Sequence, residues 1–224
     1  ERTSAMFEYT RMRLMQAREF VATKGLSQYF RERVYVQRKA IAVRKDLAEA
    51  RFTADLFERG DVRFIEVTPE NSFERHGGYV DESRKLKALY YLEQGYRGYA
   101  LVRGRNIIGD IWYYAPDQAG CARVHPDLCW LGIELGPGQV YEFDIYFTPD
   151  ERGTGLSAGL QNSAGYSQCQ KGYSTAFAYY WADNVPAIWN TRVINKYKEW
   201  KHIKVSRCFL YPGSLRLLLR QLNL

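Results

Sequence analysis

Two carboxylates, Glu142 and Asp144, are separated by one residue in the apolar segment from Val140 to Phe147. The segment predicts a strand, and side chains repeat every second residue along a strand. We therefore expect both carboxylates on one face, opposite Phe143 and Ile145. Two carboxylates on one face raise each other's proton affinity, so either could accept a proton from a substrate, directly or through water. Acidic residues that face solvent or pair with a basic helix would give the same pattern.

A glycine-rich segment, YFTPDERGTGLSAGLQ (residues 146–161), overlaps the end of this strand and continues beyond it. Pro149 ends the strand, and the glycines stand at the first turn of an expected helix. Successive backbone N–H groups can then converge on an anion with no Cβ in the way. The helix dipole would attract the same anion. The segment therefore predicts a phosphate-binding turn, and an ordinary glycine-rich turn between a strand and a helix is the alternative.

The spacing of these glycines fits more than one kind of phosphate site. Gly153, Gly155 and Ala158 match the dinucleotide pattern G-x-G-x-x-A, and Asp183 closes the next expected strand. In a doubly wound fold the glycine turn normally opens the sheet, whereas only about 40 residues follow Asp183 here. A dinucleotide site is thus an alternative with the wrong topology. A P-loop is excluded, since no Gly-Lys-Ser/Thr sequence occurs in the segment.

The hexapeptide RGTGLS (residues 152–157) resembles the acetyl-CoA signature Q/R-x-x-G-x-G/A of the GNAT (GCN5-related) N-acetyltransferase superfamily, with Ser157 where Gly or Ala is usual. The preceding YFTPDE is similar to the family's hydrophobic strand, proline and acidic turn. The stretch DNVPA (residues 183–187) is similar to the N-x-x-A/S start of the family's next helix. The order of expected elements from about residue 62 to 211 also matches the family's core.

The resemblance implies that the anion is the pyrophosphate of coenzyme A, with acetyl-CoA or another acyl-CoA as cosubstrate. It implies that amides of residues 152–157 hold the pyrophosphate and that the backbone near Ile145 and Phe147 pairs with the pantetheine arm, as a splayed strand edge can. We expect Asn184 either to cap the last helix or to contact the substrate. The expected coenzyme A contacts are Ile145, Tyr146, Phe147, Arg152, Gly153, Thr154, Gly155, Leu156, Ser157 and Asn184.

Direct acyl transfer from a thioester to an amine needs an unprotonated amine, a polarised carbonyl and a proton for the departing thiolate. Glu142 or Asp144 would take the proton of the amine. In the family, a tyrosine about seven residues beyond the helix-start asparagine often supplies the thiolate proton, but Thr191 occupies that position here. Tyr197 is the expected acid instead. Without an acid, either solvent protonates the thiolate or the protein is a non-catalytic acyl-CoA or acyl-carrier binding module of a larger protein.

The elements that must position these residues indicate an α/β fold. Residues 5–57 read as helical, with a break at Gly25-Leu26-Ser27. The remaining expected elements are strands at 62–67, 99–102, 106–114, 140–147, 174–181 and 202–211, helices at 81–94, 154–170 and 185–199, and an irregular insertion at 115–138. We therefore expect a GNAT-like mixed central sheet flanked by helices at residues 61–224, preceded by a helical N-terminal extension at residues 1–60.

The composition favours an anionic partner. The net charge is +7 and the pI about 9.2, and much of the basic excess lies in residues 31–51. This segment suggests contact with an anionic surface or a neighbouring domain, whereas a solvated helix face would explain it equally. A nucleic-acid binder is a third hypothesis, although no specific nucleic acid is expected. The acceptor is expected to bear an amine that the sequence does not identify.

The cysteines and histidines further limit the kinds of site that the chain can form. The four cysteines show no C-x-x-C spacing and the three histidines lie far apart, so no metal site is expected. Reduced thiols in the cytoplasm are the simplest interpretation. The start at Glu1 without a methionine suggests that the chain was excised from something longer.

Overall fold

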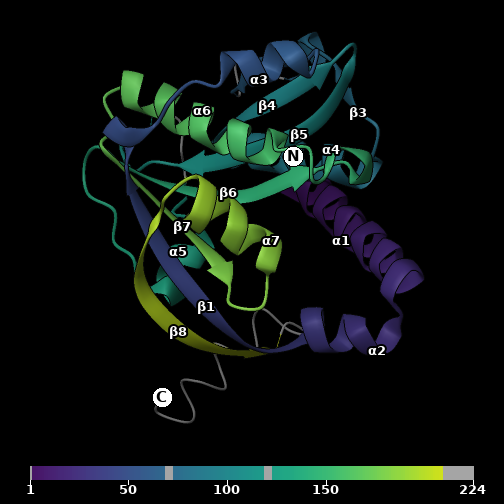
Figure 1. The fold of residues 1–224 in the computed structure, drawn as a ribbon. Coiled ribbons are helices and arrows are strands. Elements are labelled where there is room, and N and C mark those ends of the chain that lie inside the picture. Colours follow the sequence, from purple (N-terminus) through teal and green to yellow (C-terminus); the bar gives the residue numbers. More distant parts are fainter. Residues whose placement is uncertain (1, 69–72, 119–122, 209–224) are drawn as a thin grey trace.

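The fold was analysed in a computed structural model, which describes residues 2–68, 73–118 and 123–208. Eight strands form one mixed sheet (Figure 1). The strands are β1 (Tyr35–Asp46), β2 (Arg63–Val67), β3 (Gly78–Tyr79), β4 (Arg97–Arg103), β5 (Asn106–Tyr114), β6 (Gln139–Phe147), β7 (Thr175–Trp181) and β8 (Lys198–Cys208). Their order is β2-β4-β5-β6-β7-β1-β8, with β3 beside β5. Pairing is antiparallel along this path except between β6 and β7, which run parallel.

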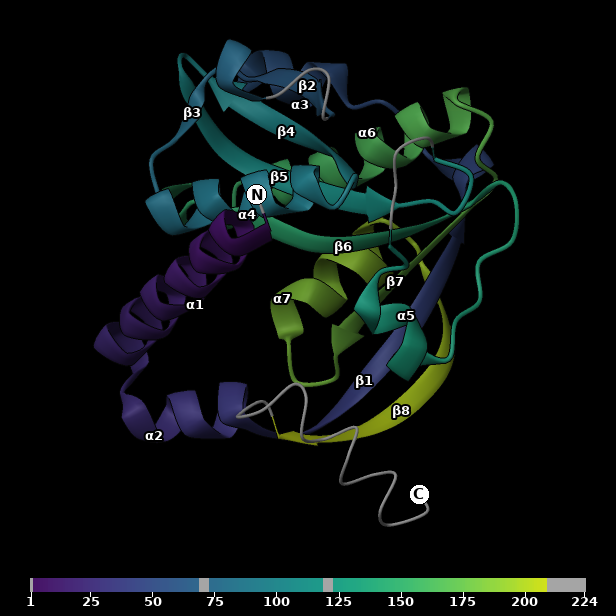
Figure 2. The same cartoon turned by 180° about the vertical axis from the view of Figure 1, so that it is seen from behind.

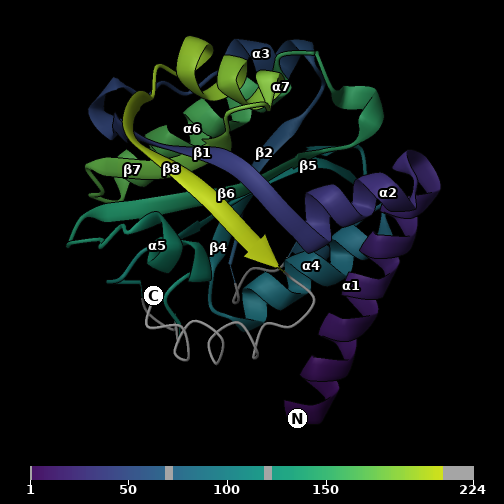
Figure 3. The same ribbon diagram turned by 90° about the horizontal axis from the view of Figure 1, so that it is seen from below.

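Helices cover both faces of the sheet. They are α1 (Arg2–Lys24), α2 (Leu26–Tyr29), α3 (Ala54–Arg59), α4 (Glu82–Glu93), α5 (Pro126–Leu131), α6 (Leu156–Gln170) and α7 (Val185–Ile188), and α7 continues as a π-helical segment, Trp189–Ile194. Figure 3 shows α3, α6 and α7 on one side of the sheet and α4 and α5 on the other. Helix α1 packs against α4, as Figure 2 shows from behind. None of the described helices is both long enough and apolar enough to cross a membrane.

Two apolar clusters hold these layers together, one on each face of the sheet. On the α6 face, Leu160 and Ala164 of the helix pack among strand residues such as Val43, Ile111 and Val140. A second set packs between the sheet and helices α4 and α5: Ala42, Ala88, Tyr91, Trp112, Leu128, Leu131, Tyr141 and Phe143. Because both faces of the central strands are buried, removal of apolar area from water stabilises the sheet from both sides.

Most of the expected elements from residue 62 onward are confirmed, because their boundaries are set locally. Helix α4 begins where expected, with the Asp81 carboxylate accepting hydrogen bonds from the amides of Ser83 (2.9 Å) and Arg84 (3.3 Å). The expected break between two N-terminal helices is also present at Gly25, whose φ is 84°. The insertion at 115–138 contains the short helix α5.

The expectation of helix over residues 31–57 is wrong for residues 35–46, whereas residues 54–57 do lie in a helix, α3. Residues 35–46 form β1, which lies between β7 and β8, so the sheet draws on residues before the expected boundary at 60/61. Ala40 and Ala42 are buried on one face of β1 while Ile41 and Val43 are buried on the other. A strand buried on both faces shows no alternation of apolar and polar residues.

The helix expected to extend to residue 199 is also shorter than expected. It ends with the π-helical segment at Ile194, where the amide of Asn195 donates to the carbonyl of Asn190 (3.0 Å). Lys196 then adopts a positive φ of 58°, which no helix continues through. Strand β8 therefore begins at Lys198 rather than at residue 202.

Candidate functional site

A β-bulge at Asp144 shapes the centre of the site. Asp110 of β5 pairs with Tyr146 of β6, but Trp112, two residues further along β5, pairs with Phe143. Two residues of β6 therefore oppose a single residue of β5, and Asp144 has a φ of 56°. Aspartate tolerates this left-handed conformation better than most residues, and an extra residue of this kind bends the strand and increases its twist.

The bulge separates the two carboxylates that the sequence placed on one face, so that expectation is wrong. Glu142 lies on the α6 face, where Gln161 of α6 donates to it, whereas Asp144 lies on the α4 face among side chains of that helix. Ile145 joins the α6 face instead of lying opposite Glu142. The extra residue shifts the alternation by one position, which is the effect of a bulge on every side chain beyond it.

Strands β6 and β7 part beside the bulge and leave a cavity between them. Their pairing runs from Gln139 and Thr175 only to Tyr141 and Phe177. Beyond this point a cavity of about 990 Å³ is lined by residues 142–147 of β6 and residues 178–181 of β7. Its lining includes side chains from both faces of the sheet, such as Ala178 on the α6 face and Tyr179 on the α4 face. The cavity therefore reaches both sides of the sheet through the gap between the strands.

The glycine turn closes the other end of this cavity. Gly153 and Gly155 have φ values of 83° and 84°, and a Cβ built on either would meet no heavy atom within 4 Å. Within the described chain, the amides of Gly153, Thr154, Gly155 and Ser157 have no internal acceptor. Gly153, Gly155 and Ser157 line the cavity, and amides without an internal acceptor at the N-terminus of a 15-residue helix suit a phosphate group. The turn is therefore a candidate binding site for a phosphate group.

Eight of the ten expected coenzyme A contacts line the cavity: Ile145, Tyr146, Phe147, Arg152, Gly153, Gly155, Ser157 and Asn184. Thr154 and Leu156 are not among the lining residues. The Thr154 hydroxyl donates to the carbonyl of Glu151 (2.8 Å), and Leu156 is buried in the core on the α6 face. These two side chains shape the turn, and a contact from Thr154 to a ligand would come from its backbone amide.

Asn184 and Asp183 have structural partners. The Asn184 side chain accepts from the amide of Ala187 (3.3 Å), so it caps α7, one of the two roles expected for it. Nε of Arg38, on β1, donates to Oδ1 (3.1 Å) and Oδ2 (3.0 Å) of the Asp183 carboxylate, and Nη2 of Arg38 also donates to Oδ1. This pairing occupies the group that a dinucleotide site would need for its ribose.

Glu142 lies in a buried polar group on the α6 face. Burial raises the pKa of Glu142, and hydrogen bonds from the Tyr197 hydroxyl (2.6 Å) and the Gln161 amide (3.3 Å) partly oppose that shift. Gln161 also accepts from Asn190 (3.0 Å) and Asn195 (3.2 Å). Of this group, Glu142, Gln161 and Asn190 line the cavity. A carboxyl with a raised pKa beside a cavity is suited to accept and release a proton.

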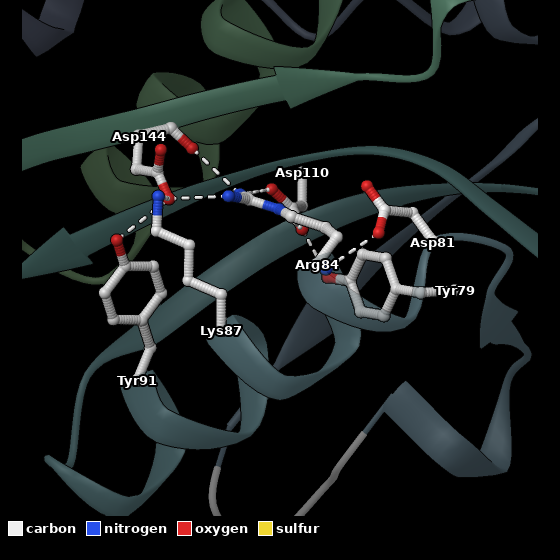
Figure 4. Close-up of polar contacts among 7 residues, drawn as sticks. All are labelled: Tyr79, Asp81, Arg84, Lys87, Tyr91, Asp110 and Asp144. Atoms are coloured by element: carbon white, nitrogen blue, oxygen red, sulfur yellow. Dashed lines mark hydrogen bonds and ion pairs between the residues drawn. The ribbon is translucent and has the colours of Figure 1, made fainter. Parts of the chain in front are cut away.

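Asp144 has the opposite electrostatic setting, drawn in Figure 4. Its carboxylate accepts from Arg84 (2.6 Å), from the Tyr91 hydroxyl (2.8 Å) and from Lys87 (2.8 Å). Burial alone would raise the pKa of Asp144, but the two cations hold it far below its usual value. A carboxylate held ionised by two cations is a weak base.

The sequence analysis missed Arg84 and Asp110, the buried partners of this cluster. Arg84 also donates to both carboxylate oxygens of Asp110, and both side chains are almost fully buried. A signal was present, since Asp110 is the one charged residue in the apolar strand NIIGDIWYY. Charged residues are almost never fully buried without a partner, so Asp110 in this strand predicts a buried cation beside it.

Tyr197 and Thr191 lie near the expected acid position. Tyr197 is 3% exposed and does not line the cavity, and its hydroxyl is bonded to Glu142. Thr191 is buried but does line the cavity. The Tyr197 hydroxyl therefore does not contact the cavity directly, and a proton from it would reach a thiolate there by way of Glu142.

The basic segment at residues 31–51 does not form the single helix face that one explanation of it required. Arg38 pairs with Asp183 and lies 4.8 Å over the ring of Trp181, while Lys45 is buried and bonded to Asn162 (2.9 Å). No cluster of histidine, cysteine and acidic side chains that could hold a metal ion is found among the described residues.

Comparisons with known proteins identify the fold. No protein-family model and no curated protein sequence matches the chain. Among solved structures, the chain is similar to the GCN5-related glucosamine N-acetyltransferase region of a fungal multi-domain GH3 β-N-acetylglucosaminidase. The identity is 15% and the TM-score 0.55, over 86% of this chain and 22% of the fungal protein. A GCN5-related N-acetyltransferase from Sphaerobacter thermophilus matches with 10% identity and a TM-score of 0.47, over 79% of this chain and 53% of that protein.

The chain thus spans about a fifth of the length of the fungal protein and about half that of the bacterial one. At these identities the likeness concerns the fold. The mixed sheet flanked by helices agrees with this likeness. The chain has the fold of the GCN5-related N-acetyltransferases, as the resemblance in its sequence indicated.

Proposed function

We propose that the protein is an acyl-CoA-dependent N-acyltransferase, which most simply transfers an acetyl group from acetyl-CoA to an amine by direct attack. The observation that best supports this proposal is the cavity between β6 and β7, which is lined from both faces of the sheet and ends at the glycine turn. A site with one anion-binding end and two open faces suits a phosphorylated donor that meets a second substrate in the middle.

The donor is proposed to enter from the α6 face. The free amides of Gly153, Thr154, Gly155 and Ser157 would hold the pyrophosphate, with Arg152 beside them. Residues 145–147 lie on the splayed half of β6, beyond the last pairing with β7, where an extended chain can bond to the strand edge. The pantetheine arm would lie there and bring the thioester to the gap between the strands.

The acceptor is proposed to approach from the α4 face, through the part of the cavity lined by Phe143, Asp144, Tyr179 and Trp181. The nitrogen lone pair forms the new C–N bond as the C–S bond breaks, and coenzyme A departs as a thiolate that takes its proton from solvent. Glu142 is the better proton acceptor, because burial raises its pKa, whereas Arg84 and Lys87 hold Asp144 ionised. Since Glu142 is only 2% exposed, a water would carry the proton from the amine.

The second candidate is a non-catalytic acyl-CoA or acyl-carrier binding module. Thr191 at the expected acid position and the burial of Tyr197 against Glu142 favour it. It gives tight acyl-CoA binding with no amine-dependent release of thiol. The fungal protein contains a glucosamine N-acetyltransferase region, so glucosamine is the first amine to test in an assay of thiol release. A cytoplasmic location and an anionic partner at residues 31–51 stay predictions.

The testing experiment is a calorimetric titration with acetyl-CoA and with NADH. In Gly155→Asp a carboxylate would enter the space proposed for the pyrophosphate, so acetyl-CoA binding should be lost. Gly172→Asp is the matched control, because Gly172 has a φ of 91° and open space but lies beyond the other end of α6. Both variants carry a similar backbone cost, of about 1–2 kcal/mol. Binding of NADH but not of acetyl-CoA would overturn the proposal.

A further inference from the structure

Arg84 of α4 contacts two adjacent strands from the α4 face and connects β5 with β6 at the bulge (Figure 4). Its Nε donates to Oδ2 of Asp110 (3.1 Å), and its Nη2 donates to Oδ1 of the same carboxylate. On the other side, Nη1 donates to Oδ2 of Asp144 (2.6 Å) and Nη2 to the backbone carbonyl of Asp144 (3.1 Å). One guanidinium thus connects a β5 carboxylate with both the side chain and the main chain of the bulged residue.

The surrounding side chains hold this group in one arrangement. The Tyr79 hydroxyl of β3 donates to Asp110, and Tyr91 and Lys87 of α4 contact Asp144. Arg84 and Asp110 are 4% and 1% exposed, so their interaction is screened little by solvent. The two cations balance the two carboxylates, which is the condition under which buried charges are retained.

Arg84 and its two carboxylate partners lie where the pairing of β5 with β6 is interrupted by the bulge. Asp110 pairs with Tyr146, the first β6 residue after the bulge to pair with β5 again. Asp144 is the bulged residue itself, with its φ of 56°. A guanidinium bound to both fixes the bulge from both strands, and β6 has left β7 by this point.

We propose that Arg84 and Asp110 are positioning residues, which hold the bulge at Asp144 and so set the opening between β6 and β7. Arginine is required because its planar fork presents N–H groups toward two carboxylates at once, whereas a lysine offers a single compact charge. The effect on ligand binding rests on the proposed function, but the effect on the strand does not.

Single substitutions test this poorly, because loss of Arg84 alone leaves the Asp110 carboxylate buried without its cation and can unfold the protein. The double variant Arg84→Gln/Asp110→Asn removes both charges together and retains amide groups for hydrogen bonding. Lys85→Gln is the matched control, because it removes one cation from the neighbouring position of the same helix.

Hydrogen exchange followed by mass spectrometry gives a readout that needs no ligand. In the double variant we expect peptides covering residues 142–148 to exchange at least fivefold faster than in the wild type, with little change over residues 98–103 of β4. Lys85→Gln should exchange like the wild type. In parallel, we expect at least tenfold weaker acetyl-CoA binding in the double variant, with a cooperative thermal transition retained.

The outcomes separate the two proposals. Unchanged exchange over residues 142–148 in the double variant overturns the positioning role, whatever the ligand result. Faster exchange in a protein whose wild type does not bind acetyl-CoA supports the positioning role and refutes the proposed function. If the double variant does not fold, Arg84→Lys replaces it, since this change keeps the charge beside Asp110 but loses the fork. The same faster exchange is expected there, and wild-type exchange again overturns the proposal.

Discussion

Gly109 of β5 lies directly opposite Phe147 of β6, and the aromatic ring covers the glycine. A Cβ built on Gly109 would lie 2.5, 2.6 and 2.7 Å from the ring atoms Cε1, Cζ and Cδ1. Carbon atoms in contact are normally about 3.5–4.0 Å apart, so Gly109→Ala must displace the ring by about 1 Å. The φ of Gly109 is not in the left-handed region, so alanine adds no backbone strain there.

The magnitude follows from two opposing effects. Overpacking a buried contact costs about 1–3 kcal/mol. Replacing a strand glycine with alanine returns about 0.5–1 kcal/mol of conformational entropy. We therefore expect Gly109→Ala to lower the free energy of unfolding by up to about 2.5 kcal/mol, which in a protein of this size lowers Tm by up to about 10 °C. Because Phe147 lines the cavity, acetyl-CoA affinity should fall as well.

Thermal unfolding followed by circular dichroism measures this effect, and Phe147→Leu provides the second half of a double-mutant cycle. In Gly109→Ala/Phe147→Leu the ring is gone, so the double variant should be more stable than the sum of the single effects by about 1 kcal/mol. Gly78→Ala is the control, because a Cβ there meets no atom within 4 Å. A Gly109→Ala variant as stable as Gly78→Ala, or a cycle without coupling, would refute the packing argument.

Two further predictions concern Glu142 and Tyr197. Burial raises the folded-state pKa of Glu142 above its usual 4.5, so ionising it costs stability as pH rises beyond that value. The Tm of Glu142→Gln relative to wild type should therefore increase between pH 4 and pH 8, and a constant difference would show that Glu142 does not titrate in this way. Tyr197→Phe removes a hydrogen bond to this carboxyl and should cost about 1.5–3 kcal/mol of stability. Because Tyr197 lies outside the cavity, we expect amine-dependent thiol release to fall less than tenfold; a fall of about 100-fold or more would identify it as the acid.

The parts of the site that the sequence predicted are those set by local chemistry. Pro149 and the two glycines mark the end of β6 and the start of α6, and the structure places the turn there, with both glycines at positive φ. The apolar runs of β5, β6 and β7 were likewise sufficient to predict strands. The structure gives the positions of the glycine turn and of the β6 residues, whereas their roles in ligand binding stay proposals.

The parts that were missed depend on contacts distant in sequence. Strand β1 pairs with β7 and β8, from the far end of the chain, and its two faces pack into the two apolar clusters on either side of the sheet. The sequence of residues 35–46 does not indicate burial on both faces, although β-branched Val36, Ile41 and Val43 favour a strand. The bulge at Asp144 depends on Arg84 and Asp110, which lie 60 and 34 residues earlier. Strict alternation was the reasonable assumption without them, and it put Asp144 on the wrong face.

The electrostatics of the Asp144 cluster bear on the nucleophile. An isolated carboxylate beside an acceptor would stabilise its ammonium form and raise the pKa of the amine, which opposes attack. In this structure Arg84 and Lys87 neutralise Asp110 and Asp144, so the α4 side of the cavity carries no uncompensated negative charge from this cluster. An acceptor amine there could lose its proton to Glu142 on the other face without first leaving an ion pair. The bulge thus places the two carboxylates on different faces of the sheet, and under the proposed function only Glu142 would take part in proton transfer.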